Sequence, residues 1–132
     1  MKEYLAEQRA AAKRAKSETA VAENLADVLA KIAAMAPNDR ELAQGLHELI
    51  ARVTPELAAK TWYGMQAYCN DEGKTVLFFQ DSGKFKARYS TLGFQDAANL
   101  DKDAMWATSF AVIGWNESVE KQVTALIKKA VK

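Results

Sequence analysis

Residues 65–89 read MQAYCNDEGKTVLFFQDSGKFKARY, and this stretch decides the fold. Three short runs are rich in aromatic and branched residues: Met65–Cys69, Lys74–Gln80 and Lys84–Tyr89. The two separators, 70–73 and 81–83, hold the Asn, Asp, Ser and Gly residues that hairpin loops prefer. The pattern therefore predicts three antiparallel strands joined by two hairpins.

Helical periodicity lies on both sides of this stretch. Before it, one amphipathic stripe predicts a first helix, formed by Val21, Leu25, Val28, Ile32 and Met35. Asn38 and Glu41 suggest the capping box of a second helix, and Thr54-Pro55 suggests the start of a short third helix that Gly64 stops. After it, Trp106–Ile113 is predicted as a fourth strand, and Asn116 caps a last helix. The fold class that follows is α+β, a two-layer sandwich with an antiparallel sheet of about four or more strands and helices packed on one face.

Length and charge bound the organisation of the chain. Its 132 residues suit a single domain, which we place at residues 19–132, after a basic helical extension at residues 1–18. Within that extension, residues 2–16 carry a net charge of +3, with Lys2, Arg9, Lys13, Arg14 and Lys16 against Glu3 and Glu7. The whole chain has a net charge of only +1, which argues against a nucleic-acid partner.

Composition also narrows the class of protein. One Cys and one His exclude a disulfide framework and a Cys/His-rich zinc site. No apolar run is long enough to cross a bilayer, and the sequence does not begin like a secretory signal, so we predict a cytoplasmic protein with no membrane partner.

The register of the second hairpin predicts a binding surface. If Gln80 pairs with Lys84, Phe79 lies opposite Phe85 on the side of the sheet that faces the helices. The other side then carries an apolar group beside three cations: Met65, Val76, Phe78, Lys84, Lys86 and Arg88. Such a face suits a small anionic ligand, a protein partner or a second copy of the chain, and it is equally typical of a solvated sheet. A slip of one residue would exchange the two faces.

Five segments carry a resemblance to a known family: 61–68 (TWYGMQAY), 78–80 (FFQ), 84–94 (KFKARYSTLGF), 99–101 (NLD) and 105–106 (MW). They resemble the YdhG-like domain of unknown function over roughly residues 21–131. The family usually has proline where this chain has Gln66. The resemblance implies a frataxin-like α+β sandwich, and some family members are described as iron chaperones. It supplies no catalytic residues.

An iron site would therefore have to be formed by carboxylate side chains. Hard cations prefer clustered carboxylate oxygens. The first helix offers Glu23 and Asp27 one turn apart, which makes them the weak candidates for an iron site. No recognisable metal-binding motif accompanies either residue. We therefore expect no cofactor, and iron is implied only by the family resemblance.

An enzyme is the minor alternative. His47 lies beside the apolar stripe of the second helix and is expected at a surface boundary, and Cys69 is expected as a packing residue. No nucleophile elbow, phosphate loop or metalloprotease motif is present. An aromatic pocket could be lined by Trp62, Tyr63, Tyr68, Trp106 and Trp115. The sequence therefore favours a binding or interaction module without chemistry of its own, with iron delivery as the alternative.

Overall fold

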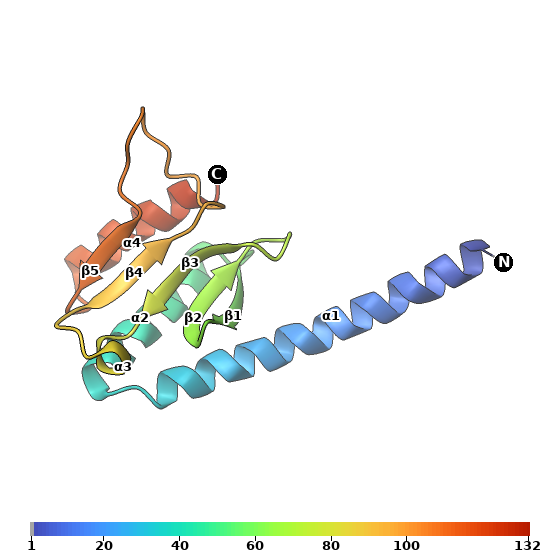
Figure 1. The fold of residues 1–132 in the computed structure, drawn as a ribbon, viewed down its shortest axis with the longest axis horizontal. Coiled ribbons are helices and arrows are strands. Elements are labelled where there is room, and N and C mark those ends of the chain that lie inside the picture. The colour runs from blue at the N-terminus through green and yellow to red at the C-terminus, as the bar shows by residue number, and fades with distance from the viewer. Residues whose placement is uncertain (1) are drawn as a thin grey trace.

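The computed structural model describes the backbone of residues 2–132 and the side chains of residues 18–132. Its elements are, in chain order, α1 (Lys2–Ala33), α2 (Pro37–Val53), β1 (Ala58–Trp62), β2 (Met65–Cys69), β3 (Thr75–Gln80), α3 (Ser82–Phe85), β4 (Ser90–Phe94), β5 (Ser109–Val112) and α4 (Glu117–Ala130). The strands form one antiparallel sheet in the order β1-β2-β3-β4-β5 (Figure 1). The predicted α+β class and antiparallel sheet are confirmed, with five strands in the part of the chain that the structure describes.

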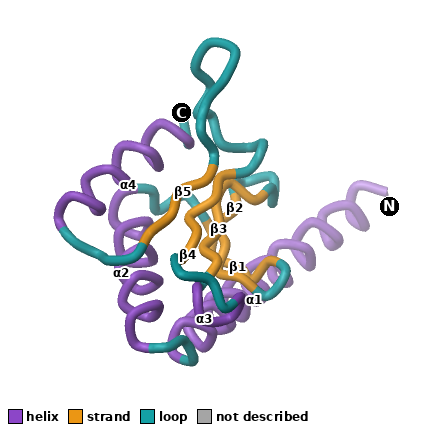
Figure 2. Tube along the Cα trace, turned by 60° about the vertical axis from the view of Figure 1, so that its left-hand side comes forward, coloured by secondary structure: helices purple, strands orange, loops and turns teal. Residues whose placement is uncertain are grey.

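The core lies between the sheet and the helices α2 and α4, which share one side of the strands in Figure 2. Leu77 and Phe79 of β3 are 0% and 2% exposed and belong to the same buried cluster as Leu42 and Leu46 of α2 and Ile127 of α4. Burying a side chain of this size stabilises the fold by about 1.5–3 kcal/mol. This cluster therefore holds the two layers together.

The alternation predicted for β3 is confirmed. Phe79 points into the core, and Phe78 points to the opposite side of the sheet, where its ring lies against Gly93. A Cβ at Gly93 would clash with that ring, so only glycine fits beneath it.

The strand predicted at Lys84–Tyr89 is wrong. Residues 82–85 form the short helix α3, Lys86 adopts a left-handed conformation with φ 51°, and the next strand begins only at Ser90. Consequently Phe79 pairs with Leu92 and Gln80 with Thr91, and Phe85 lies outside the sheet.

The third helix predicted after Thr54 is also wrong. The Thr54 hydroxyl donates a hydrogen bond to the Ile50 carbonyl, so this residue ends α2 and caps no following helix. Residues 58–62 instead form the edge strand β1, which pairs with β2. At the other end of α2, Pro37 begins the helix and the expected Asn38–Glu41 capping box is not formed.

The helix α1 runs from Lys2 to Ala33 without a break across the expected boundary at residues 18/19. Val28, Ile32 and Met35 of its predicted stripe are buried, whereas Val21 and Leu25 are 50% and 40% exposed. Figure 1 shows the N-terminal half of the helix extending beyond the rest of the fold. The side chains of the basic residues predicted for this arm lie outside the described residues.

The C-terminal part follows the prediction more closely. The Asn116 side chain accepts a hydrogen bond of 2.9 Å from the Val119 backbone N–H and begins α4, as predicted. The fourth predicted strand is shorter than expected, because β5 spans only Ser109–Val112 and Trp106 lies in the exposed loop before it.

Candidate functional site

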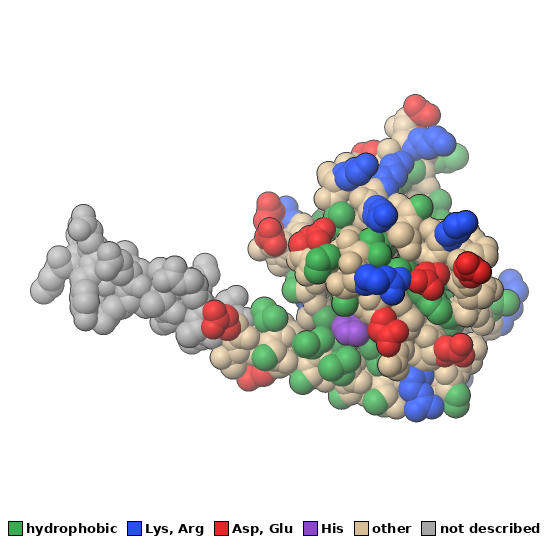
Figure 3. Space-filling view, turned by 180° about the vertical axis from the view of Figure 1, so that it is seen from behind, with side chains coloured by type: hydrophobic (Ala, Val, Ile, Leu, Met, Phe, Trp, Pro, Cys, Tyr) green, Lys and Arg blue, Asp and Glu red, His purple; other side chains and the backbone are tan. Residues whose placement is uncertain are grey.

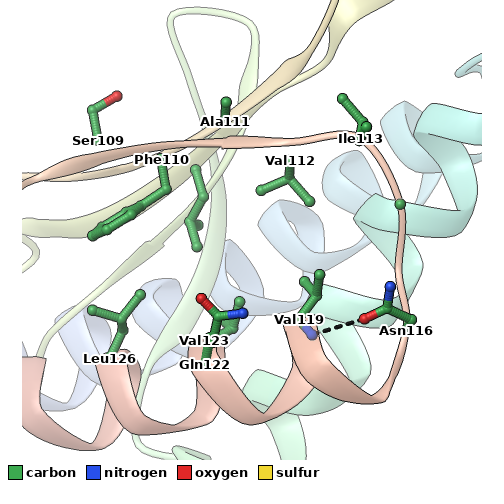
Figure 4. A pocket seen from close by; sticks show the side chains of 12 residues that line it. Ser109, Phe110, Ala111, Val112, Ile113, Asn116, Val119, Gln122, Val123 and Leu126 are labelled. Carbon is green, nitrogen blue, oxygen red and sulfur yellow. Dashed lines mark hydrogen bonds between the residues drawn. The ribbon is translucent and has the colours of Figure 1, made fainter.

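A groove of about 670 Å³ lies between β5 and α4 (Figure 4). None of its lining residues is charged: Leu92, Ser109, Phe110, Ala111, Val112, Ile113, Gly114, Asn116, Val119, Gln122, Val123 and Leu126. Figure 4 shows Phe110 and Val112 pointing toward α4, while Ser109, Ala111 and Ile113 point away from it. The groove therefore offers a mainly apolar surface to a ligand.

The sequence of α4 explains why the groove is open. Val123, Ile127 and Ala130 are buried in the core. A second line of side chains at i, i+3 and i+7, made by Val119, Gln122 and Leu126, faces the groove instead. The apolar face of α4 is thus wider than the sheet beside it can cover.

The outer edge of β5 borders this groove. Phe94 donates its backbone N–H to the Thr108 carbonyl at 2.7 Å, and hydrogen-bonded pairs alternate along an antiparallel ladder. Leu92/Phe110 and Ser90/Val112 are then the bonded pairs toward β4. The backbone N–H and C=O groups of Ser109 and Ala111 accordingly point outward, where no described strand pairs with them.

The six residues predicted to form a binding face are only partly brought together. Met65 and Phe78 do lie on the same side of the sheet, but Met65 is 9% exposed and Val76 is 2% exposed. Lys84 donates from its Nζ to the Gly64 carbonyl at 3.0 Å, which holds it at the β1–β2 turn. Lys86 and Arg88 lie in the exposed turn after α3 and not on the sheet, because the strand expected there does not form.

A ring pair that sequence reasoning did not identify covers this face. The Trp62 and Phe78 rings lie 5.4 Å apart between centroids, and both are half-buried. The helix predicted to stop at Gly64 would include Trp62, so sequence reasoning does not place this residue on the edge strand β1. Ligand binding by the predicted face stays a prediction.

A carboxylate organises the loop between β3 and β4. Asp39 of α2 accepts hydrogen bonds from the Ser82 hydroxyl at 2.7 Å, the Gly83 N–H at 2.9 Å and the Ser90 hydroxyl at 3.0 Å. Burial alone raises the pKa of Asp39, but these hydrogen bonds outweigh it and hold the pKa below its ordinary value. The contacts span 43 to 51 residues, so no local pattern could have shown them.

His47 belongs to a second polar network, between α2 and β2. Gln66 donates from Nε2 to the Ala43 carbonyl at 3.0 Å and to the Tyr68 hydroxyl at 2.7 Å. That hydroxyl lies 2.8 Å from Nδ1 of His47, so Tyr68 can donate its own hydrogen to a neutral imidazole. Gln66 is fully buried, and its Oε1 has no hydrogen-bond partner among the described residues. Gln66 therefore links the sheet to α2 through its side chain.

The pKa values in this network favour neutral groups. Burial lowers the pKa of His47, against a smaller opposing effect of the Glu48 carboxylate. Burial raises the pKa of Tyr68, and the hydrogen bond from Gln66 only partly offsets it. His47 is half-buried, at a boundary as predicted, and Cys69 is half-buried with its Sγ 3.5 Å from the Ala58 carbonyl.

The other candidate residues do not gather into one site. Glu23 and Asp27 are exposed on α1, and the described residues contain no group of three or more His, Cys, Asp or Glu side chains able to hold a metal ion. The five aromatic residues of the predicted pocket do not line one cavity: the Trp62 and Tyr63 rings meet edge to face, 4.8 Å apart between centroids, but the others lie elsewhere. Tyr68 faces α2, Tyr63 is 82% exposed at a turn, Trp106 lies in a loop, and Trp115 packs against Gly45.

Comparisons with protein-family models, with curated proteins and with solved structures found no match to this chain. In the part of the chain that the structure describes, no helix combines the length and the apolar character needed to cross a membrane.

Proposed function

We propose that this protein is a binding module that takes up an extended segment of a partner protein along β5. The observation that carries the proposal is the outward-facing backbone of Ser109 and Ala111 beside a groove without charged lining. An added strand would pair with these groups and place every second side chain in the groove. Main-chain pairing would supply affinity, and the groove would supply selectivity.

The lining defines the chemistry of the partner. A charged side chain placed between Phe110 and Leu126 would lose its hydration without gaining an ion pair. The bound segment should therefore carry uncharged, apolar side chains at alternating positions. Gln122 and Asn116 can each hydrogen-bond a small polar group at the rim.

Other expectations from the sequence stay proposals. The YdhG-like resemblance, with its frataxin-like arrangement and helices packed on one face, is supported by the quoted motifs and by the shared side of α2 and α4. Iron delivery rests on that resemblance alone, and a cytoplasmic location rests on composition. Binding of a small anion by the cations Lys84, Lys86 and Arg88 would require them to act from the α3 turn.

Nuclear magnetic resonance can test the proposal with a capped peptide of about six residues that alternates valine and threonine. Amide shifts should concentrate at residues 109–113 and on the groove face of α4. Ala111→Pro removes an outward donor without breaking the ladder to β4, so it should abolish binding while the fold remains. Ala111→Thr keeps that donor and is the matched control. Equal binding by both variants, or shifts elsewhere, would refute strand addition at β5.

A further inference from the structure

An exposed apolar stripe runs along the described part of α1. Val21, Leu25 and Leu29 recur every four residues and are 50%, 40% and 48% exposed. The neighbouring Val28 and Ile32 already fill the core, so the stripe is additional to what the domain needs. Three large apolar side chains exposed in one row are typical of a helix that packs against another helix.

Two hollows border this stripe on the side that faces α2. One, of about 400 Å³, lies between Val21 and Leu25 of α1 and residues 55–59. The other, of about 370 Å³, lies between residues 29–33 of α1 and the 40–48 part of α2. His47 lines both, so the hollows form a crease along α1 with His47 between them. Figure 3 shows hydrophobic side chains gathered around the purple histidine on this side of the molecule.

The charges of α1 divide between its two halves. Residues 2–16 carry a net charge of +3. Residues 18–32 carry the exposed acids Glu18, Glu23 and Asp27 against one base, Lys31. The crease itself is lined by the exposed acids Glu48 and Glu56 and by one exposed base, Arg40. The two halves have equal length, about 22 Å each at 1.5 Å per residue.

We infer that α1 pairs antiparallel with α1 of a second copy of this chain. A two-fold axis near Ser17 sets the basic half of each helix against the acidic, apolar half of the other. The basic half is rich in alanine, which lets the helices approach closely over Val21, Leu25 and Leu29. A 22 Å segment is long enough to cover the crease from Val21 to Ala33. The basic half of one helix therefore matches the acidic half of the other both in charge and in length.

Charge exchange between two variants tests the pairing. In the first variant, Lys13→Glu, Arg14→Glu and Lys16→Glu make both halves acidic. In the second, Glu18→Lys, Glu23→Lys and Asp27→Lys make both halves basic. Light scattering after gel filtration should give twice 14.6 kDa for the native chain and 14.6 kDa for each variant alone. An equimolar mixture of the two variants should recover the dimer, because their charges are again complementary.

Replacing exposed apolar residues of α1 by glutamate provides a second test. Leu25→Glu with Leu29→Glu should abolish the dimer while circular dichroism shows an intact fold, because both side chains are exposed in the single chain. A monomeric native chain, or a variant mixture that stays monomeric, would overturn the inference. Loss of the dimer in Ala111→Pro alone would place the contact at β5 instead, so the α1 pairing and strand addition can fail separately.

Discussion

Residues 75–80 and 84–89 are both predicted as strands, yet only the first segment is one. Both contain aromatic residues, follow a turn-forming separator and are predicted as strands. In the structure, Leu77 and Phe79 of the first segment are buried in the core, whereas Phe85 and Tyr89 of the second are 46% and 38% exposed. An alternating pattern becomes a strand only when a neighbouring backbone and a core surface are available to it.

Asp39 supplies the reason for the difference. Its carboxylate accepts hydrogen bonds from Ser82, Gly83 and Ser90, and thereby holds both ends of the loop against the first turn of α2. Asp81 caps α3 by accepting from the Lys84 N–H, and Ala87 donates its N–H back to the Ser82 carbonyl. These contacts use the backbone groups that a hairpin ladder would need.

The largest expected effect is a contrast between two phenylalanines. Phe79→Ala should lower the free energy of unfolding by about 3–5 kcal/mol, because it leaves a cavity beneath β3. Phe85→Ala, its predicted strand partner, should change that free energy by less than about 0.5 kcal/mol. Urea unfolding followed by circular dichroism measures both. A large loss for Phe85→Ala would show that the 84–89 segment packs against the core.

The second prediction concerns the carboxylate that holds the loop. Asp39→Asn should cost about 1–3 kcal/mol, because it weakens three hydrogen bonds at a buried position. Since the pKa of Asp39 is lower in the folded state, its contribution is fully present above pH 3.8 and is lost as the pH falls through the folded value.

The difference in stability between native chain and Asp39→Asn should accordingly shrink in acid, as measured by urea unfolding at a series of pH values. Asp96→Asn, at an exposed position, is the matched control and should leave the pH dependence unchanged. A constant difference down to the lowest pH would contradict the assigned role of the charge.

The smallest effect is expected at the end of α3. Lys86 has φ 51° and ψ 40°, a conformation that costs a side-chain-bearing residue more than glycine. Lys86→Gly should therefore stabilise the chain by less than about 1 kcal/mol, since the flexibility of glycine in the unfolded state offsets part of the gain. Thermal unfolding measures the change. Lys86→Ala retains a Cβ and should show no gain, so a gain shared by both variants would assign the effect to lost charge.

Sequence reasoning recovered the elements whose signals are local. The stripe of Val28 and Ile32, the alternation of Phe78 and Phe79, and the Asn116 cap each depend on residues within one or two turns of each other. It failed at Thr54, where the same hydroxyl can cap the helix before it or the helix after it. It also missed the groove beside β5, because the depth of a groove depends on how far apart a strand and a helix pack.

The amino-acid sequence by itself determined the α+β composition, the side of the sheet on which Phe79 lies and the charge division of α1. These features follow from hydrophobic periodicity and from the numbers of charged residues, and neither depends on contacts between distant residues. Only the tertiary structure decided that residues 84–89 leave the sheet, that Gln66 joins Tyr68 to α2, and that β5 ends the sheet with an edge to which no described strand pairs. Each of these features depends on residues that are distant in the sequence. A hydrogen bond between residues 43 positions apart leaves no local periodic pattern from which it could be predicted.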